Sequence, residues 1–184
     1  EWFTDEGSEY HNQANIERAH ALLAEAGYDG EEITVLSNRD YDWMYRTTLA
    51  AVTQLERAGV NVVMEFHDWN SQIAKALSLE GSHINQSGWS LHEEPLRSRG
   101  NLMTGAPYGY GYSNPEMDRL LVEIGRPASF EERKDIWEKV QAMYYEDVPV
   151  ILMGDLYGLE ATRAEIQNYE SWYVVPIFWN IWRE

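Results

Sequence analysis

The chain has 184 residues, which is enough for one well-filled domain. Its 31 Asp and Glu residues outnumber its 14 Lys and Arg residues, so the formal net charge is −17. A field of that sign repels phosphate backbones and anionic lipids, which argues against nucleic acid as a partner. The sequence has no cysteine and no apolar run near the roughly 18 residues of a membrane-spanning helix, so we expect no disulfide, thiolate metal site or membrane span.

Helices and strands are expected to alternate through the first half of the chain. Asn15 is predicted to cap a first helix that Gly27 ends, and a second helix is predicted over residues 42–58. A third, shorter helix is expected to follow a cap at Asp68 or Asn70. Short apolar runs and alternating apolar residues predict three strands, at residues 33–36, 60–66 and 83–90.

The second half combines a long loop with two helices. Residues 91–112 are rich in Gly, Pro and Tyr and lack periodicity, so we expect an irregular segment there and look for a site in it first. Asn114 is predicted to cap one helix, and Ser129 with Glu132 forms a capping box for a longer one. A strand is expected over residues 148–153, followed by short extended pieces.

This order of elements predicts an α/β fold with a single domain over residues 1–184. Strands that alternate with helices form parallel pairs through right-handed crossovers, so we expect the first strands to be parallel. The aromatic content is high for so acidic a chain, with 8 Trp and 12 Tyr, and Trp172, Trp179 and Trp182 lie close to its end.

The sequence lacks the standard motifs of cofactor and metal chemistry. It contains no glycine-rich phosphate loop, no Gly-x-Ser-x-Gly nucleophile turn, and no metalloprotease pair among its 5 His residues. We therefore expect no cofactor, no metal site and no catalytic residue.

The densest titratable cluster is His92, Glu93 and Glu94, just after a predicted strand end, where α/β folds bind ligands. A metal site or a glycosidase carboxylate pair would need side chains that face one another across a ligand. Neighbours in a loop usually face water instead, so the residues alone favour a solvated loop.

Two further side chains are candidates for ligand contact. Trp89, at the end of the third predicted strand, suits core packing and a ligand platform about equally. Arg46 suits either a ligand carboxylate or a pair with Asp42 one helical turn away, and the residues alone slightly favour the pair.

Five segments together resemble the C-terminal half of family 5 extracellular solute-binding proteins, the peptide, dipeptide and nickel receptors of ABC importers. These segments occur in the family's order, at Ala19–Gly30, Gly59–Trp69, Gly88–Trp89, Gly111–Glu123 and Glu132–Pro149. The resemblance implies one lobe of a two-lobe, periplasmic-binding-protein-like fold of type II, with a mixed sheet flanked by helices.

The resemblance also implies a function and its partners. The chain would be the C-terminal lobe of a longer receptor, and together with an N-terminal lobe it would capture a small solute and deliver it to an ABC permease. The expected location is periplasmic or extracellular, lipid- or membrane-associated in a Gram-positive source, with the export signal outside this chain. Residues 170–184 are expected to form a tail that packs toward the other lobe.

The family pattern also selects residues for the solute site. Trp89 matches the family's strand-end Trp beside the ligand, and His92 stands where peptide receptors carry an Asp, which leaves peptide specificity open unless Glu93 or Glu94 replaces it. Arg46 matches an arginine of dipeptide receptors. The predicted ligand-binding set is Tyr41, Trp43, Arg46, Trp89, Ser90, His92 and Glu93.

Three alternatives stay open. The aromatic content allows an oligosaccharide-binding receptor. A hydrolase of acidic pH would use Glu93, Glu94 or Asp155, and a protein-interaction module would use the aromatic tail, which could also drive self-association.

Overall fold

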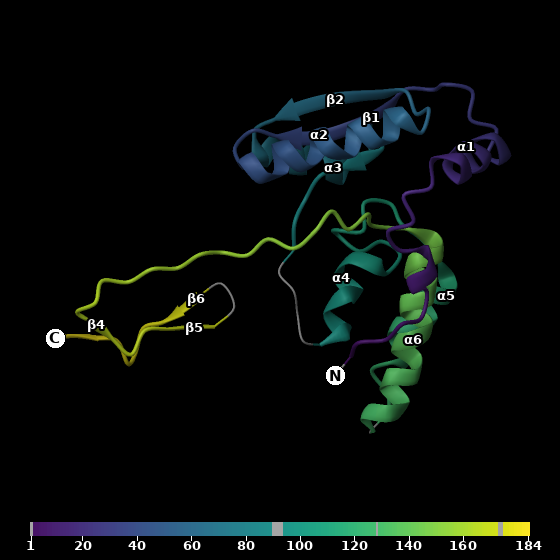
Figure 1. Ribbon diagram of the computed structural model, residues 1–184. Coiled ribbons are helices and arrows are strands. Elements are labelled where there is room, and N and C mark those ends of the chain that lie inside the picture. Colours follow the sequence, from purple (N-terminus) through teal and green to yellow (C-terminus); the bar gives the residue numbers. More distant parts are fainter. Residues whose placement is uncertain (1, 90–93, 128, 173–174) are drawn as a thin grey trace. The chain divides into compact units, whose positions relative to one another are not determined.

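The computed structural model describes residues 2–89, 94–127, 129–172 and 175–184 (Figure 1). The chain divides into two compact units, Glu1–Ile151 and Leu152–Glu184. In the described part of the chain, no helix has the length and apolar character needed to cross a membrane.

A parallel three-stranded sheet organises the first part of the larger unit. Its strands β1 (Ile33–Asn38), β2 (Val62–His67) and β3 (Ile84–Asn85) lie in the order β2-β1-β3. In the register of the sheet, Ile33 pairs with Val62 and Val35 pairs with Ile84. The predicted α/β fold and the parallel first strands are therefore confirmed.

Two helices cover the central strand. α2 (Asp42–Arg57) and α3 (Trp69–Ser78) both contact β1, along which residues 34–38 are all buried (Figure 1). Successive buried residues point to opposite faces of a strand, so β1 is covered on both sides. The apolar side chains of this core are Val35, Leu36, Met44, Val52 and Ala76.

The predicted helix starts agree with the structure. In α1 (Ile16–Glu25) the Asn15 side chain accepts a hydrogen bond from the Arg18 backbone N–H, and before α3 Asp68 caps the Ser71 N–H in the same way. Such caps satisfy backbone donors that the first helical turn leaves free.

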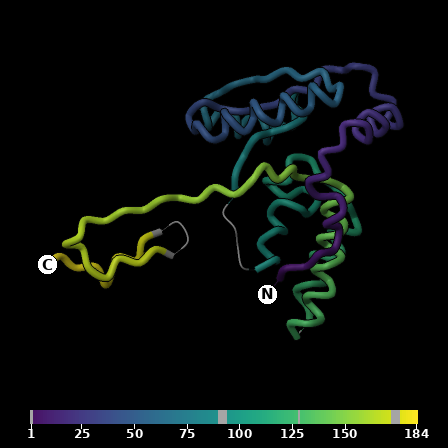
Figure 2. The backbone as a smooth tube through the Cα atoms, viewed as in Figure 1, coloured from purple at the N-terminus to yellow at the C-terminus, as the bar shows by residue number. Residues whose placement is uncertain are grey.

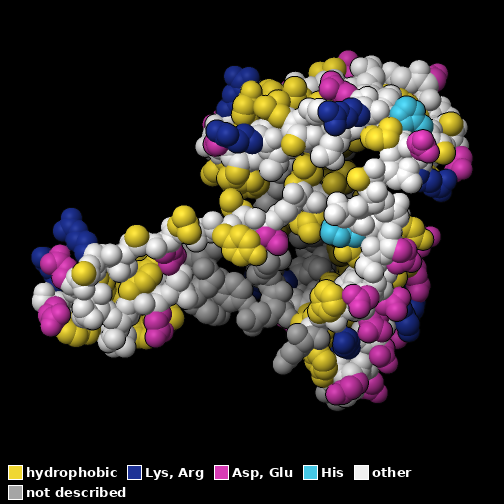
Figure 3. Space-filling model, viewed as in Figure 1, with side chains coloured by type: hydrophobic (Ala, Val, Ile, Leu, Met, Phe, Trp, Pro, Cys, Tyr) yellow, Lys and Arg dark blue, Asp and Glu magenta, His cyan; other side chains and the backbone are white. Residues whose placement is uncertain are grey.

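The same unit contains a second, helical core. It is formed by α4 (Arg99–Leu102), α5 (Pro115–Glu123) and α6 (Phe130–Asp147), and α5 lies along α6 in Figure 1. The buried side chains of this core are Leu102, Met117, Leu120, Leu121, Ile124, Ile136 and Val140. Acidic side chains line the outer surface over α5 and α6 (Figure 3).

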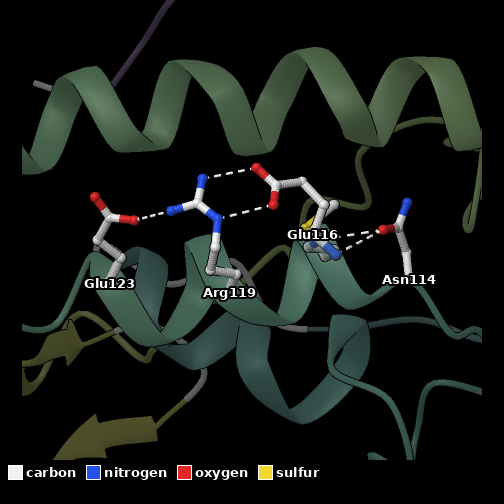
Figure 4. Close-up of polar contacts among 5 residues, drawn as sticks. Asn114, Glu116, Arg119 and Glu123 are labelled. Carbon is white, nitrogen blue, oxygen red and sulfur yellow. Dashed lines mark hydrogen bonds and ion pairs between the residues drawn. The ribbon is translucent and has the colours of Figure 1, made fainter.

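Polar contacts fix the start and the exposed side of α5. The Asn114 side chain caps the backbone N–H groups of Glu116 and Met117, as predicted. Arg119 binds both carboxylate oxygens of Glu116, at 2.6 and 2.8 Å, and also pairs with Glu123 (Figure 4). These pairs lie at the helical spacings where opposite charges meet, but exposed ion pairs stabilise a protein little.

The N-terminal segment and the 3-10 helix η1 (Ser8–Tyr10) that follows it pack on α6. The Gln141 side chain donates to the backbone carbonyls of Thr4 and Glu6, at 2.8 and 2.9 Å. Gly7 has a φ of 77°, and a Cβ there would lie 2.8 Å from the Tyr145 ring. Only glycine combines this backbone angle with so close an approach.

The described residues of the unit 152–184 form short strands. β4 (Ile166–Gln167) pairs with β7 (Trp182–Arg183), and β5 (Glu170–Trp172) pairs with β6 (Val175–Ile177), both antiparallel. Parallel and antiparallel pairing thus both occur, in separate sheets. Figure 2 shows the residues that lead from position 152 to β4 as an extended segment.

Three predictions of local structure need correction. Residues 148–153 form no strand, because α6 continues to Asp147 and Val148 ends it with a left-handed φ of 48°. The third strand is much shorter than residues 83–90. The segment 91–112 is not wholly irregular, since Pro95 starts the 3-10 helix η2 (Pro95–Ser98), which leads into α4.

Candidate functional site

The carboxyl ends of the three parallel strands meet at one edge of the sheet. The segment after β1 carries Tyr41, the segment after β2 carries Trp69, and the segment after β3 carries Ser87, Gly88 and Trp89. Open α/β sheets bind ligands at this edge, because the loops that follow the strands diverge there. This edge is therefore the first place to look for a ligand site.

A pocket of about 350 Å³ opens at this edge. Its walls come from the start of α3, the segment after β3 and the glycine- and tyrosine-rich segment before α5. The residues that line it are Trp69, Asn70, Ile73, Ser87, Gly88, Trp89, Tyr108 and Tyr110. Among these described residues four are aromatic and none is charged, a composition typical of pockets that bind small organic molecules.

Further aromatic rings stand beside the pocket. The rings of Tyr41 and Trp69 meet edge to face, with their centroids 5.6 Å apart, and Trp43 lies 6.4 Å from Tyr41. The Trp43 ring also lies against the backbone of Gly88, where an added Cβ would be 2.7 Å from its Cη2 atom. Tyr41 and Trp43 thus position pocket residues without lining the pocket themselves.

A chain of side-chain amides joins the ends of β1 and β3 through α3. Asn38, at the end of β1, donates to the Gln72 side chain at 2.7 Å. Gln72 in turn donates to the Asn85 side chain and to the Gln86 carbonyl, both at 2.7 Å. Asn38 and Gln72 are fully buried, where such hydrogen bonds hold a site rigid.

Tyr110 combines an uncommon backbone conformation with a partly buried side chain. Its φ is 46°, in the left-handed region that residues other than glycine rarely adopt. Burial raises the pKa of its hydroxyl, and the neighbouring side chains of Ser87 and Asn85 oppose that rise. The Asn85 Nδ2 atom is buried and has no hydrogen-bond partner within the described residues. A strained backbone and an unused buried donor are typical of functional sites.

The residues predicted for the site fall into three groups. Trp89 lines the pocket with 43% of its surface exposed, and Tyr41 and Trp43 lie beside it. Arg46 is not among the lining residues and binds Asp42 at 2.7 Å, with 75% of its side chain exposed. The remaining three predicted residues, Ser90, His92 and Glu93, lie outside the described residues.

The Glu94 side chain makes contacts within the fold. Its side chain accepts a hydrogen bond from the Leu96 N–H at the start of η2 and pairs with Arg133 of α6. It therefore links the segment after β3 to the helical core.

Seven of the eight described lining residues were not in the predicted set, and two of them, Ser87 and Gly88, directly precede Trp89. Trp69, Asn70 and Ile73 lie at the start of α3. The sequence feature that could have identified them is the position of α3 directly after β2, at the edge of the sheet where ligands bind. Tyr108 and Tyr110 belong to the segment 91–112, in which a site was expected without a particular residue being named.

Comparison with known proteins places these features in context. No model of a protein family matches the chain. A probable peptide ABC transporter periplasmic-binding protein of Sinorhizobium fredii is 25% identical over 175 residues, which cover 90% of this chain and 32% of the relative. The chain therefore spans about a third of the length of this relative.

Solved structures share the fold. The ABC transporter substrate-binding protein CtaP of Listeria monocytogenes is 24% identical, with a TM-score of 0.71 over 80% of this chain and 30% of its own. A periplasmic oligopeptide-binding protein of Borrelia burgdorferi is 27% identical, with a TM-score of 0.64 over 73% of this chain and 28% of its own. The resemblance to family 5 extracellular solute-binding proteins is confirmed, and the chain has the fold of one part of such a protein.

Proposed function

We propose that the chain is the C-terminal, solute-binding lobe of a receptor that serves an ABC importer. The observation that carries the proposal is the uncharged aromatic pocket at the carboxyl ends of β1, β2 and β3, in a fold shared with substrate-binding proteins of such importers. The relative from Sinorhizobium fredii, by its name, serves peptide transport, so a peptide or peptide-like solute is the first candidate.

The mechanism is closure of two lobes around the solute. The pocket supplies one wall, and an N-terminal lobe supplies the other, so that the solute loses its water when the lobes close. The closed form is the state that the permease recognises. No bond is made or broken, and the protein is not an enzyme. The site of action is the periplasm or the outer face of the cytoplasmic membrane.

Residues around the pocket would orient the solute. Arg46 pairs with Asp42 on an exposed surface, so the guanidinium can exchange this partner for a ligand carboxylate at little cost. Ser90, His92 and Glu93 follow Trp89 directly in the sequence and are proposed to contact the polar end of the solute. A carboxylate at Glu93 would serve as counter-ion for an ammonium group, which a histidine cannot do.

Thermal unfolding of the full-length receptor tests this function. A solute at a hundredfold excess over its dissociation constant should stabilise the receptor by about 2.7 kcal/mol. Trp89→Ala should remove most of that gain, whereas Phe3→Ala, at an exposed ring outside the pocket, should keep it. If a broad library of peptides, saccharides and metal complexes never shifts the melting temperature, the proposed function is wrong.

A further inference from the structure

We infer that the pocket holds an uncharged ring of the solute that carries a hydrogen-bond acceptor. This inference rests on the proposed function and specifies what its pocket recognises. Two sources present this chemistry, a sugar ring of a saccharide and an aromatic side chain of a peptide, such as a tyrosine with its phenolic oxygen.

The walls of the pocket favour a flat, uncharged group. Trp69, Trp89 and Tyr108 present aromatic surface, and Ile73 adds an aliphatic side chain. A ring stacks on such surfaces over a large contact area. None of the lining residues that the structure describes is charged, so an ammonium or carboxylate group placed against them would lose its water without gaining a counter-ion from them.

The polar groups of the pocket favour an acceptor on that ring. The Asn85 Oδ1 atom accepts a hydrogen bond from Gln72, so its Nδ2 atom is directed to the other side, where it is buried without a partner in the described part of the chain. Asn85 neighbours Tyr110 and Ser87, both of which line the pocket. A ligand oxygen that bonds to the Tyr110 hydroxyl would complete this group of donors.

The pocket is large enough to hold one ring of the solute. Its volume of about 350 Å³ is near the lower limit of small-molecule sites. The rest of the solute would then lie toward the opposite lobe, where charged ends can meet counter-ions outside the pocket.

Calorimetric titration of the full-length receptor separates the possibilities. The probes are the uncharged saccharides maltotriose and cellobiose and the tripeptides Ala-Tyr-Ala, Ala-Ala-Ala, Ala-Lys-Ala and Ala-Asp-Ala. We expect a ring-bearing probe to bind at least tenfold more tightly than the last three peptides. Tightest binding by a saccharide identifies a sugar ring, and tightest binding by Ala-Tyr-Ala identifies a phenolic side chain; either result supports the inference.

Substitutions connect that preference to the pocket. Tyr110→Phe removes one hydroxyl and keeps the ring, so it should weaken the best ring-bearing probe about fivefold. Trp89→Ala should weaken it about tenfold or more, and Trp89→Phe should weaken it less. Tyr10→Phe, at an exposed tyrosine outside the pocket, is the matched control and should leave binding unchanged.

The inference and the proposed function fail in different ways. If Ala-Lys-Ala or Ala-Asp-Ala binds as tightly as every ring-bearing probe, or if Tyr110→Phe lowers the affinity of all probes by the same factor, the inference is wrong while the receptor function stands. If neither these probes nor the broader library bind, the proposed function itself is wrong.

Discussion

Gly88 is a pocket residue whose backbone lies directly against an aromatic ring. A Cβ at this position would lie 2.7 Å from the Cη2 atom of Trp43, so Gly88→Ala must push the indole ring away. The ring is half-buried and can shift, so we expect a loss of about 1 kcal/mol in the free energy of unfolding, at the low end for an overpacked site. Urea unfolding measures this loss, and near-ultraviolet circular dichroism should report the displaced indole.

Gly100 provides the matched control for that substitution. It lies in α4, and a Cβ there would meet nothing within 4 Å. Gly100→Ala should therefore leave stability unchanged or raise it by about 0.5 kcal/mol, because alanine loses less backbone entropy on folding. Equal losses at both glycines would contradict a specific contact between Trp43 and Gly88.

At the scale of elements, Gln72 connects α3 to the strand ends. Its fully buried side chain binds Asn38, Asn85 and the Gln86 carbonyl. Gln72→Ala leaves these polar groups without partners and creates a cavity, so we expect a loss of about 2–4 kcal/mol in unfolding free energy. Gln54→Ala, at an exposed position of α2, should change it by less than about 0.5 kcal/mol. A loss at Gln72 no larger than that of the control would mean that water replaces the amide contacts.

Strand β2 carries a pH-dependent contact with α3. A hydrogen bond from Lys75 and a second from His67, both at 2.9 Å, hold the pKa of the Glu65 carboxyl below its ordinary value of 4.5. In the unfolded chain the carboxyl titrates at its ordinary value, so the contact stabilises the fold above that pH and its contribution is lost as the pH falls through the lower, folded pKa.

The test is the pH dependence of unfolding free energy in two variants. Glu65→Gln should unfold with a flatter dependence than the parent below about pH 4.5, and Glu56→Gln, at an exposed position of α2, should follow the parent. The difference should be small, because the Glu65 side chain is partly exposed to solvent. Parallel curves for Glu65→Gln and the parent would show that the pairs with Lys75 and His67 contribute nothing.

The elements that the sequence predicts well are those with local signals. The caps at Asn15, Asn114 and Ser129 depend on one side chain and the next three residues, and all three are present in the structure. The strand expected at residues 148–153 does not form, because an apolar run needs a partner strand, and no strand in the described part of the chain pairs with these residues. Local pattern shows where a strand is allowed, whereas pairing decides whether it forms.

The candidate site shows the same limit. Trp89 could be predicted because it follows a strand closely, but Tyr108 and Tyr110 line the same pocket only through the fold, from about twenty residues further along the chain. No spacing rule relates two such segments, since the path of an irregular loop depends on what it packs against. The sequence therefore predicted the edge of the sheet that carries the site and only part of the residues that line it.

At the scale of the whole molecule, net charge and exposed apolar surface act in opposite directions. The charge of −17 makes copies of the chain repel one another. Residues 152–184 expose large apolar side chains, among them Phe178 at 70% and Trp179 at 85%, and apolar side chains are visible on this unit in Figure 3. Exposed apolar patches favour association, so the outcome depends on how far salt screens the charge.

We therefore predict that the 184-residue chain self-associates more as the salt concentration rises. The screening length falls from about 30 Å at 0.01 M to about 10 Å at 0.1 M salt, which removes most of the repulsion but leaves apolar contacts intact. Sedimentation equilibrium should show monomer at low salt and larger species at high salt. The double substitution Phe178→Ser and Trp179→Ser should restore the monomer, whereas Phe3→Ser, which removes an equally exposed ring from the other unit, should not. Association that persists in the double variant would place the contact outside the aromatic tail.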